Sequence, residues 1–204
     1  MRPKRLTYTL QALDADGYLN DATGAGPWTT ILALTTDGAA HKVTIASAAN
    51  LSALTITVTG TDPNGWALTE AITGPNATTV TSTKYFKTVT GVSSSGTLGA
   101  NTMDVGWAAA CATPTYPVNQ YADGYGPSVG VDIGGTVTYT GWQCNGDVYA
   151  VSSEDMPWLA ISSGMTGATT DQLAAATIAT TGIRITVASH TSGALAITYA
   201  QGRC

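Results

Sequence analysis

Residues 54–59 have the sequence Leu54-Thr55-Ile56-Thr57-Val58-Thr59, in which aliphatic and threonine side chains alternate. A period of two sends neighbouring side chains to opposite faces of a β-strand. Threonine and β-branched aliphatic residues also fit the pleated surface of a sheet. The stretch therefore predicts a half-buried strand whose inner face is apolar and whose outer face carries hydroxyl groups.

The same alternation recurs along the chain, and about one residue in six is threonine. Strand signals follow one another at spacings of roughly eight to twelve residues, with turn residues between them. No segment shows the periodicity of a long helix. We therefore predict an all-β fold, an antiparallel β-sandwich or jelly roll with little helix, built as two β units. The other alternating runs are residues 137–140, 183–187 and 195–199.

One turn carries a specific geometric signal. Asp62-Pro63-Asn64-Gly65 lies between two alternating runs, with proline at the second position and glycine at the fourth. This is the chemistry of a type I turn whose last residue adopts a left-handed conformation. It predicts a hairpin that joins the strand ending near residue 60 to a strand over residues 66–72.

The division into domains is predicted from composition. We expect an N-terminal β domain over residues 1–112, a connection over residues 113–126 and a C-terminal β domain over residues 127–204. The middle segment is assigned as a connection because it lacks periodicity and contains Pro114 and Pro117.

Three shorter segments are assigned from local composition alone. Residues 14–17 are expected in a loop, because they combine aspartate and glycine. Residues 29–34 are expected to form a strand, and residues 171–177 to form a single helical turn or a loop.

The charge content limits the function. Charged residues make up 10% of the chain, and the net charge is -5, whereas about a quarter of an average soluble domain is charged. An acidic chain lacks the basic stripe that nucleic-acid binding requires. A surface this poor in charge suggests that other protein covers much of it. Arg2, Lys4 and Arg5 form a basic N-terminal arm, which is either a contact to an acidic partner or a solvated start of the chain.

The sequence predicts neither a membrane span nor a disulfide framework. No apolar run reaches the length of about 18 residues that crosses a bilayer, and residues 6–11 are too polar for a signal-peptide core. The three cysteines, Cys111, Cys144 and Cys204, are odd in number and widely spaced. We therefore expect reduced thiols and synthesis in a cytoplasm.

Few residues suggest catalysis or metal binding. Asp14-Ala15-Asp16-Gly17 departs from a calcium loop, since glycine comes too early and no glutamate follows. Glu154-Asp155 is an adjacent carboxylate pair, whereas acid–base carboxylates usually come from separate elements. A nucleophile–base pair of Cys144 and His190 stays an alternative, and His41 has no metal-ligand spacing. We predict no catalytic residue, no cofactor and no metal site, and we expect that the protein is not an enzyme.

Five tryptophans accompany a single phenylalanine. Tryptophan in a β-sandwich serves as a core side chain, as an anchor in a protein interface, or as a stacking platform for a sugar. We predict Trp28, Trp66 and Trp158 as partner contacts, together with the basic arm.

A longer stretch adds a resemblance to a known group of proteins. Residues 58–75 (VTGTDPNGWALTEAITGP), their continuation at 83–92 (TKYFKTVTGV), and the pair of segments 135–140 and 182–187 are similar to tailed-bacteriophage and prophage virion proteins. The likeness spans most of residues 40–200, and within this group the chain resembles capsid decoration, or cement, proteins.

This resemblance implies a structural role with no catalytic residues. A decoration protein binds the assembled head and stabilises it by bridging coat subunits. The implied partners are the major capsid protein and neighbouring copies of the same chain, oligomeric within the particle. The implied location is the virion, after synthesis in a bacterial cytoplasm. The alternatives are a head–tail junction or tail component, and, in a different class, a carbohydrate-binding or receptor-binding β module.

Overall fold

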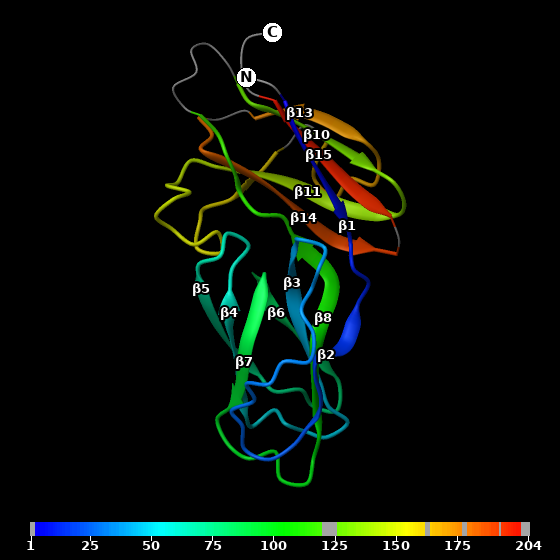
Figure 1. Cartoon of the computed structure of the whole chain (residues 1–204), viewed down its shortest axis with the longest axis vertical. Coiled ribbons are helices and arrows are strands. Elements are labelled where there is room, and N and C mark those ends of the chain that lie inside the picture. The colour runs from blue at the N-terminus through cyan, green and yellow to red at the C-terminus, as the bar shows by residue number, and fades with distance from the viewer. Residues whose placement is uncertain (1–2, 120–125, 162–163, 177–178, 192, 201–204) are drawn as a thin grey trace. The chain divides into compact units, whose positions relative to one another are not determined.

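Antiparallel β-strands form the regular secondary structure of the residues that the structure describes, and no helix is found among those residues (Figure 1). The computed structural model describes residues 3–119, 126–161, 164–176, 179–191 and 193–200. The predicted all-β antiparallel fold is confirmed. The strands are β1 (Lys4–Thr9), β2 (Asp14–Ala22), β3 (Ala40–Ala46), β4 (Thr55–Thr61), β5 (Ala67–Thr73), β6 (Thr79–Phe86), β7 (Thr88–Ser94), β8 (Met103–Ala112), β9 (Tyr116–Pro117), β10 (Ser128–Ile133), β11 (Val137–Cys144), β12 (Leu159–Ala160), β13 (Gln172–Ala175), β14 (Gly182–His190) and β15 (Ala194–Ala200).

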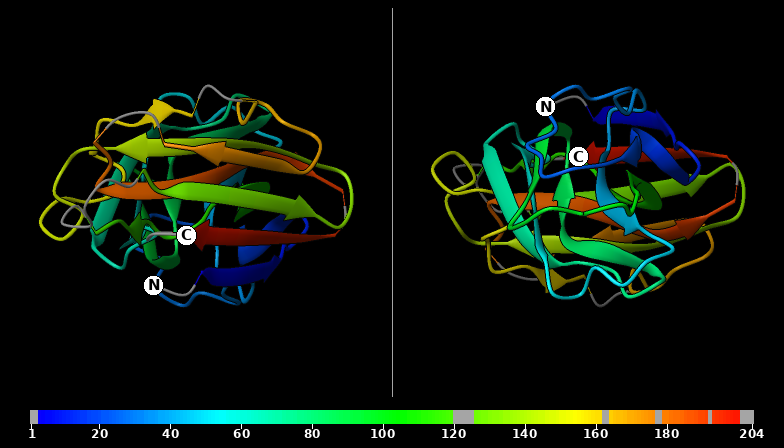
Figure 2. Two further views of the ribbon diagram at one scale, coloured as in Figure 1. Left: turned by 90° about the horizontal axis from the view of Figure 1, so that it is seen from above. Right: turned by 90° about the horizontal axis from the view of Figure 1, so that it is seen from below.

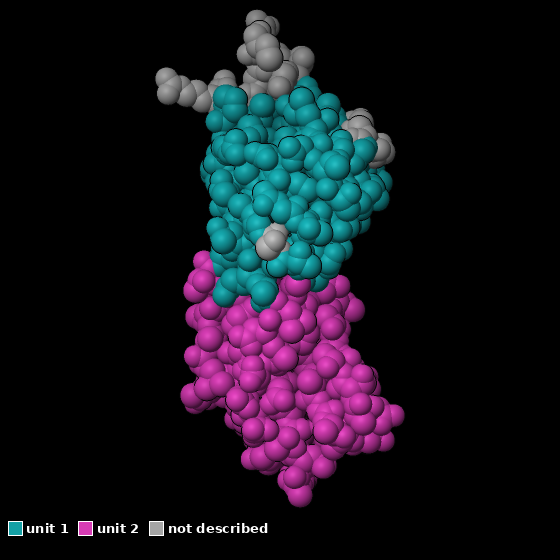
Figure 3. All heavy atoms as spheres, turned by 90° about the vertical axis from the view of Figure 1, so that its right-hand side faces the viewer, with its two compact units in different colours: residues 1–12, 37–39, 110–204 teal, residues 13–36, 40–109 magenta. Residues whose placement is uncertain are grey.

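The chain forms two compact units (Figure 3). Unit 1 consists of residues 1–12, 37–39 and 110–204, and unit 2 of residues 13–36 and 40–109. These bounds differ from the predicted domains, because the N-terminal segment belongs with the C-terminal half.

The physical reason for this difference is a pairing between the ends of the chain. Strand β1 pairs along its whole length with β15, from Lys4 opposite Tyr199 to Thr9 opposite Ala194. Local patterning does not reveal a partner so far away in the sequence. The predicted connection also contains a strand, since β9 pairs with β14.

Unit 1 is built around two sheets that share one core. The first sheet has the order β1-β15-β10-β13, and β1, β15 and β10 lie side by side in Figure 2. The second places β11 between β12 and β14. Apolar side chains from both sheets form one buried cluster, as expected for a sandwich. Its largest members include Tyr139, Ile161, Met165, Ile183, Ile185 and Leu195.

Unit 2 packs the sheet β5-β4-β7 against strands β2, β3, β6 and the first part of β8. Its core includes Tyr18, Ile45, Ile56, Phe86 and Met103. One carboxylate also joins the two layers. Glu70 on β5 accepts hydrogen bonds from the backbone N–H groups of Thr83 and Lys84 on β6, at 2.7 and 3.0 Å. These bonds satisfy donors at a point where the β6 ladder is interrupted.

The predicted Asp62–Gly65 hairpin is confirmed. It joins β4 to β5, and the Gly65 N–H donates to the Asp62 carbonyl at 3.0 Å. Gly65 has a φ of 92°, the left-handed conformation that favours glycine. The buried Asp62 carboxylate accepts from the backbone N–H groups of Asn64 and Trp66, at 2.9 and 2.8 Å.

Three local assignments were wrong. Residues 14–17 lie in strand β2, and residues 172–175 form strand β13. Residues 29–34 form no named strand, although the N–H groups of Leu32 and Ala33 donate to carbonyls of β2. Packing explains the glycine in β2, since a Cβ on Gly17 would lie 2.2 Å from the Trp107 ring. Glycine here allows close packing of two elements rather than a turn.

Candidate functional site

The sheet β5-β4-β7 has an outer face made almost entirely of hydroxyl and methyl groups. Ile56 and Val58 on β4 are fully buried, whereas Thr55 and Thr59, which flank them in the sequence, are exposed. Directly paired residues share a face, so the register carries this pattern across the sheet. We call this surface the threonine face; it consists of Thr55, Thr57, Thr59, Thr61, Thr69, Thr73, Thr88 and Ser93, with Ala67, Ala71 and Gly91 between them.

The threonine face carries no charged side chain. Glu70 is the one charged residue of β4, β5 and β7, and it pairs with Val58 on the opposite, inner side of the sheet. Thr61 and Thr88 hydrogen-bond to each other through their hydroxyls at 2.7 Å. The face therefore offers neutral donors and acceptors to a partner.

The basic arm lies in unit 1. Lys4 and Arg5 start strand β1, where the Lys4 ammonium lies 5.7 Å from the centre of the Tyr116 ring. Arg5 forms an exposed ion pair with Asp132 at 2.9 Å. Arg2, the third predicted contact of the arm, lies outside the described residues. Both described cations thus have a neighbour within the chain, and their role toward a partner stays a prediction.

The three selected tryptophans have different surroundings. Trp28 packs on the core of unit 2, and its indole N–H donates to the Thr23 carbonyl at 3.1 Å. Trp158 packs against Cys144, Val148 and Met156, and its N–H donates to the Ser153 carbonyl at 2.7 Å. Both are anchored within the chain.

Trp66 differs from these two. It lies directly after the hairpin turn with 43% of its surface exposed. Of the three, it therefore has the largest accessible aromatic surface for a partner, and its role as a contact stays a prediction.

The carboxylate pair Glu154-Asp155 is not arranged as two catalytic acids. Glu154 forms an ion pair with Arg184 on β14 at 2.7 Å, and both side chains are almost completely buried. The Trp158 ring covers the Arg184 guanidinium at 4.4 Å. This arrangement holds the segment before β12 on the second sheet of unit 1.

Cys144 and His190 do not meet. In the β11–β14 ladder Cys144 pairs with Gly182, whereas His190 pairs with Val137 at the other end. That separation is seven residues of strand, about 23 Å. His190 instead contacts the Gln11 carbonyl at 2.8 Å, and His41 contacts the Ala108 carbonyl at 2.9 Å. The two histidines therefore bind backbone carbonyls rather than a nucleophile.

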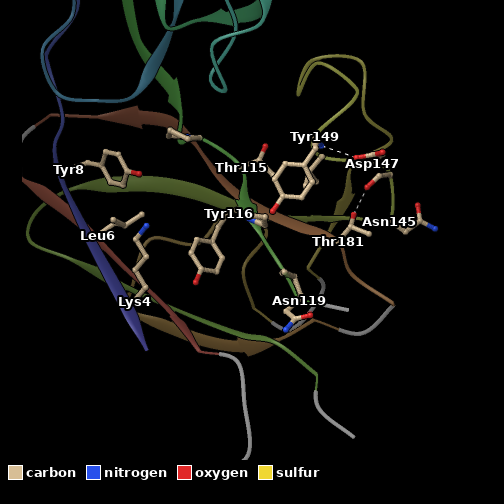
Figure 4. Close-up of a pocket in the computed structure, with 15 residues that line it drawn as sticks. Lys4, Leu6, Tyr8, Thr115, Tyr116, Asn119, Asn145, Asp147, Tyr149 and Thr181 are labelled. Carbon is tan, nitrogen blue, oxygen red and sulfur yellow. Dashed lines mark hydrogen bonds between the residues drawn. The ribbon is translucent and has the colours of Figure 1, made fainter. Parts of the chain in front are cut away.

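A groove in unit 1 was not predicted. It has a volume of about 1040 Å³ and lies between the start of β1, the segment around β9 and the turn after β11 (Figure 4). Its lining combines aromatic, amide and hydroxyl groups. The polar and aromatic lining residues are Lys4, Tyr8, Thr115, Tyr116, Asn119, Asn145, Asp147, Tyr149 and Thr181.

Little in the sequence indicates this groove. Its walls come from the N-terminus, from the segment assigned as a connection, and from a turn without periodicity. The one available signal was Tyr149, a large aromatic residue in a loop, and 74% of its surface is exposed. Among the lining residues, burial raises the pKa of the Tyr8 phenol, and Asp37 and Cys111 raise it further.

The described part of the chain shows neither a cluster of metal-ligating side chains nor a helix that could span a membrane. No group of three or more His, Cys, Asp or Glu side chains is placed to hold a metal ion. No helix there is long and apolar enough to cross a membrane.

Comparisons with known proteins add little to this description. No protein-family model and no curated protein matches the chain. A solved viral structure, "Structure of infectious bursal disease virus Gx strain", aligns with 97% of this chain and 71% of that chain at 15% identity. The TM-score of 0.19 is too low for this likeness to support any inference.

Proposed function

We propose that this chain is a structural protein of a tailed-bacteriophage particle that decorates the assembled head. Its partners would be the major capsid protein and neighbouring copies of itself. The observation that carries the proposal is the threonine face, a surface of three strands with many hydroxyls and no charge. It adds to the resemblance in residues 58–75 and 83–92.

A neutral hydroxyl surface suits permanent contact with protein. Removing a hydroxyl from water costs far less than removing a charge, provided that a partner group completes its hydrogen bond. Each such bond contributes only about 0.5–1.5 kcal/mol, so a stable contact needs many of them. A symmetric shell supplies this number, because the same contact repeats at every copy.

The composition supports the same conclusion. With 10% charged residues, the chain carries less charge than a free soluble domain usually needs. A protein whose surface is permanently covered by neighbouring subunits does not need this surface charge. Binding only the assembled shell would also stabilise that form by mass action.

A head–tail junction or tail position would use the same face and stays the alternative within this class. The other alternative, a sugar-binding or receptor-binding module built on tryptophan, receives less support from the described residues. Trp28 and Trp158 are engaged within the chain, which leaves Trp66 as the exposed platform.

Co-sedimentation tests the proposal. The purified chain is mixed with expanded shells, and separately with unassembled coat protein, from the phage or prophage that encodes it. We expect binding to shells and none to free coat protein. Equal binding to both, or binding to neither, would contradict a decoration role.

A matched pair of variants locates the contact. Thr59→Lys combined with Thr69→Lys places two charges on paired positions of the threonine face. We expect shell binding to weaken by more than about tenfold, because the lysines would be buried without partners. Thr7→Lys combined with Thr9→Lys makes the same change at exposed positions of β1 in unit 1. This control should bind as the unaltered chain does.

A further inference from the structure

The groove of unit 1 gathers polar groups whose hydrogen-bonding capacity is unused among the described residues. The Asn145 amide and the Tyr149 hydroxyl have no hydrogen-bond partner there. Asp147 uses one carboxylate oxygen, which accepts from the Tyr149 backbone N–H at 2.9 Å, and its exposed side chain lines the groove. These exposed groups hydrogen-bond to water, and a ligand in the groove can replace that water.

The loop that carries these side chains is held firmly by other groups. The Thr181 hydroxyl donates to the Gly146 carbonyl at 2.6 Å, and the Asp147 carbonyl accepts from the N–H groups of Ala150 and Val151. Val148 is buried against Cys144 and Met156. The backbone is therefore fixed, whereas the side chains on either side of Val148 are exposed. Binding residues are commonly presented in this way, on a loop fixed by a rigid scaffold.

The opposite wall of the groove is also held in place by contacts within the chain. The Tyr116 ring stacks on the Tyr199 ring, with centroids 4.1 Å apart and planes 4° from parallel. Lys4 lies over Tyr116 at 5.7 Å. Figure 4 shows Lys4 and Tyr116 on one side of the groove, and Tyr149 and Asp147 on the other.

We propose that this groove binds a neutral oligosaccharide. A sugar ring presents a C–H face that packs on an exposed aromatic ring, and Tyr149 supplies such a ring at 74% exposure. The hydroxyls at the edge of the sugar ring need amide and carboxylate partners, which Asn145 and Asp147 supply. Aromatic rings combined with a small number of placed polar groups are typical of ligand sites.

Charge and size define the ligand further. Of the described lining residues, Lys4 is the one cation and Asp147 the one anion, so the groove has no net charge. A phosphate or a polyanion requires several cations or backbone N–H donors in convergence. The volume of about 1040 Å³ lies slightly above the range of about 300–1,000 Å³ for small-molecule sites, which favours several sugar units over one.

This proposal does not rest on the proposed shell contact, because its residues lie in unit 1 and the threonine face lies in unit 2. Chemical-shift titration of the full chain tests it directly. The probes are maltohexaose, cellohexaose, mannohexaose and the hexamer of N-acetylglucosamine, with a heparin-derived hexasaccharide as the charged comparison.

We expect at least one neutral hexasaccharide to shift resonances around Asn145 and Tyr149. Tyr149→Ala and Asn145→Ala should each weaken that binding by about tenfold or more. Both side chains are exposed, so neither change should unfold the chain. Trp66→Ala, which removes an exposed aromatic ring of unit 2, should leave the affinity unchanged.

Three results would overturn the proposal. One is the absence of any shift with the neutral probes at concentrations on the order of 10 mM. Another is binding that Tyr149→Ala does not weaken. The third is preferential binding of the heparin-derived probe, which would assign the groove to an anionic ligand. None of these outcomes depends on whether the chain binds a phage shell.

Discussion

Glu154 and Arg184 form an ion pair at 2.7 Å in which the side chains are only 6% and 10% exposed. The Trp158 ring closes over the guanidinium, and the Ser153 carbonyl also accepts from it at 3.4 Å. The pair joins a loop to the first part of strand β14, so it fixes the position of the loop rather than tuning a reaction.

Breaking this pair should destabilise the protein strongly. Glu154→Gln leaves a buried guanidinium without its counter-charge, a change that typically costs about 3–5 kcal/mol. Urea denaturation measures the free energy of unfolding. Asp132→Asn is the matched control, because it breaks the exposed Arg5–Asp132 pair of similar length and should cost at most about 1 kcal/mol. Equal effects of the two changes would contradict the structural role of the buried pair.

The Asp62–Gly65 turn should depend on the aspartate carboxylate. Asp62→Ala removes the acceptor for two backbone N–H groups and leaves them without a partner, so a loss of about 1–3 kcal/mol is expected. Gly65→Ala forces a side chain into the left-handed region and should cost about 1–2 kcal/mol. Thermal unfolding of both variants provides the measurement. Unchanged midpoints would show that the turn does not determine the β4–β5 hairpin.

Alkaline pH should weaken the fold. Burial raises the pKa of the Tyr139 phenol to about 12, and the nearby Asp171 carboxylate raises it further. An unfolded tyrosine has a pKa of about 10. The folded state therefore holds its proton more tightly, and the resulting stability is present below pH 10 and is lost as the pH rises from about 10 to 12.

Denaturation at a series of pH values from about 8 to 11 tests whether the free energy of unfolding falls as the pH rises. Burial also raises the pKa values of Tyr8 and Tyr199, so their contributions have the same direction. Tyr139→Phe removes the hydrogen bond to the Thr170 carbonyl and should reduce the pH dependence. A free energy of unfolding that stays level above pH 10 would contradict the assignment.

The buried thiols should be inert in the folded protein. Burial raises the pKa of the Cys111 thiol, and Asp37 adds to the effect. Cys144 is fully buried, with its sulfur 3.7 Å from that of Met156. Cys204 lies outside the described residues, so the test uses Cys204→Ser. Iodoacetamide should label this variant slowly in buffer and at both cysteines in urea, whereas rapid labelling of the native form would contradict the burial.

The sequence predicted the positions of the strands better than it predicted which of their faces are buried. The alternation around Ile56 and Val58 identified β4 and its buried face, because one side of that sheet faces solvent. The same alternation around Arg184 was misleading, since a loop covers the second face of β14 and buries the arginine. Whether the polar side of a strand stays exposed depends on distant segments that periodicity does not reveal.

The two candidate sites also differ in whether local sequence patterns could predict them. The threonine face was predictable, since it lies on a single hairpin and one neighbouring strand. The groove was not, because Lys4, Tyr116 and Tyr149 come from three separate segments. The pairing of β1 with β15 brings Lys4 to the C-terminal half of the chain, and no local sequence pattern predicts that pairing.

The most direct test of the central claim is an electron-microscopic reconstruction of expanded shells incubated with the purified chain. We predict symmetric density for the chain on the outer surface of the shell, with Thr57, Thr59 and Thr69 facing coat protein or a neighbouring copy. A shell surface without added density, or a bound chain whose threonine face points to solvent, would contradict the account.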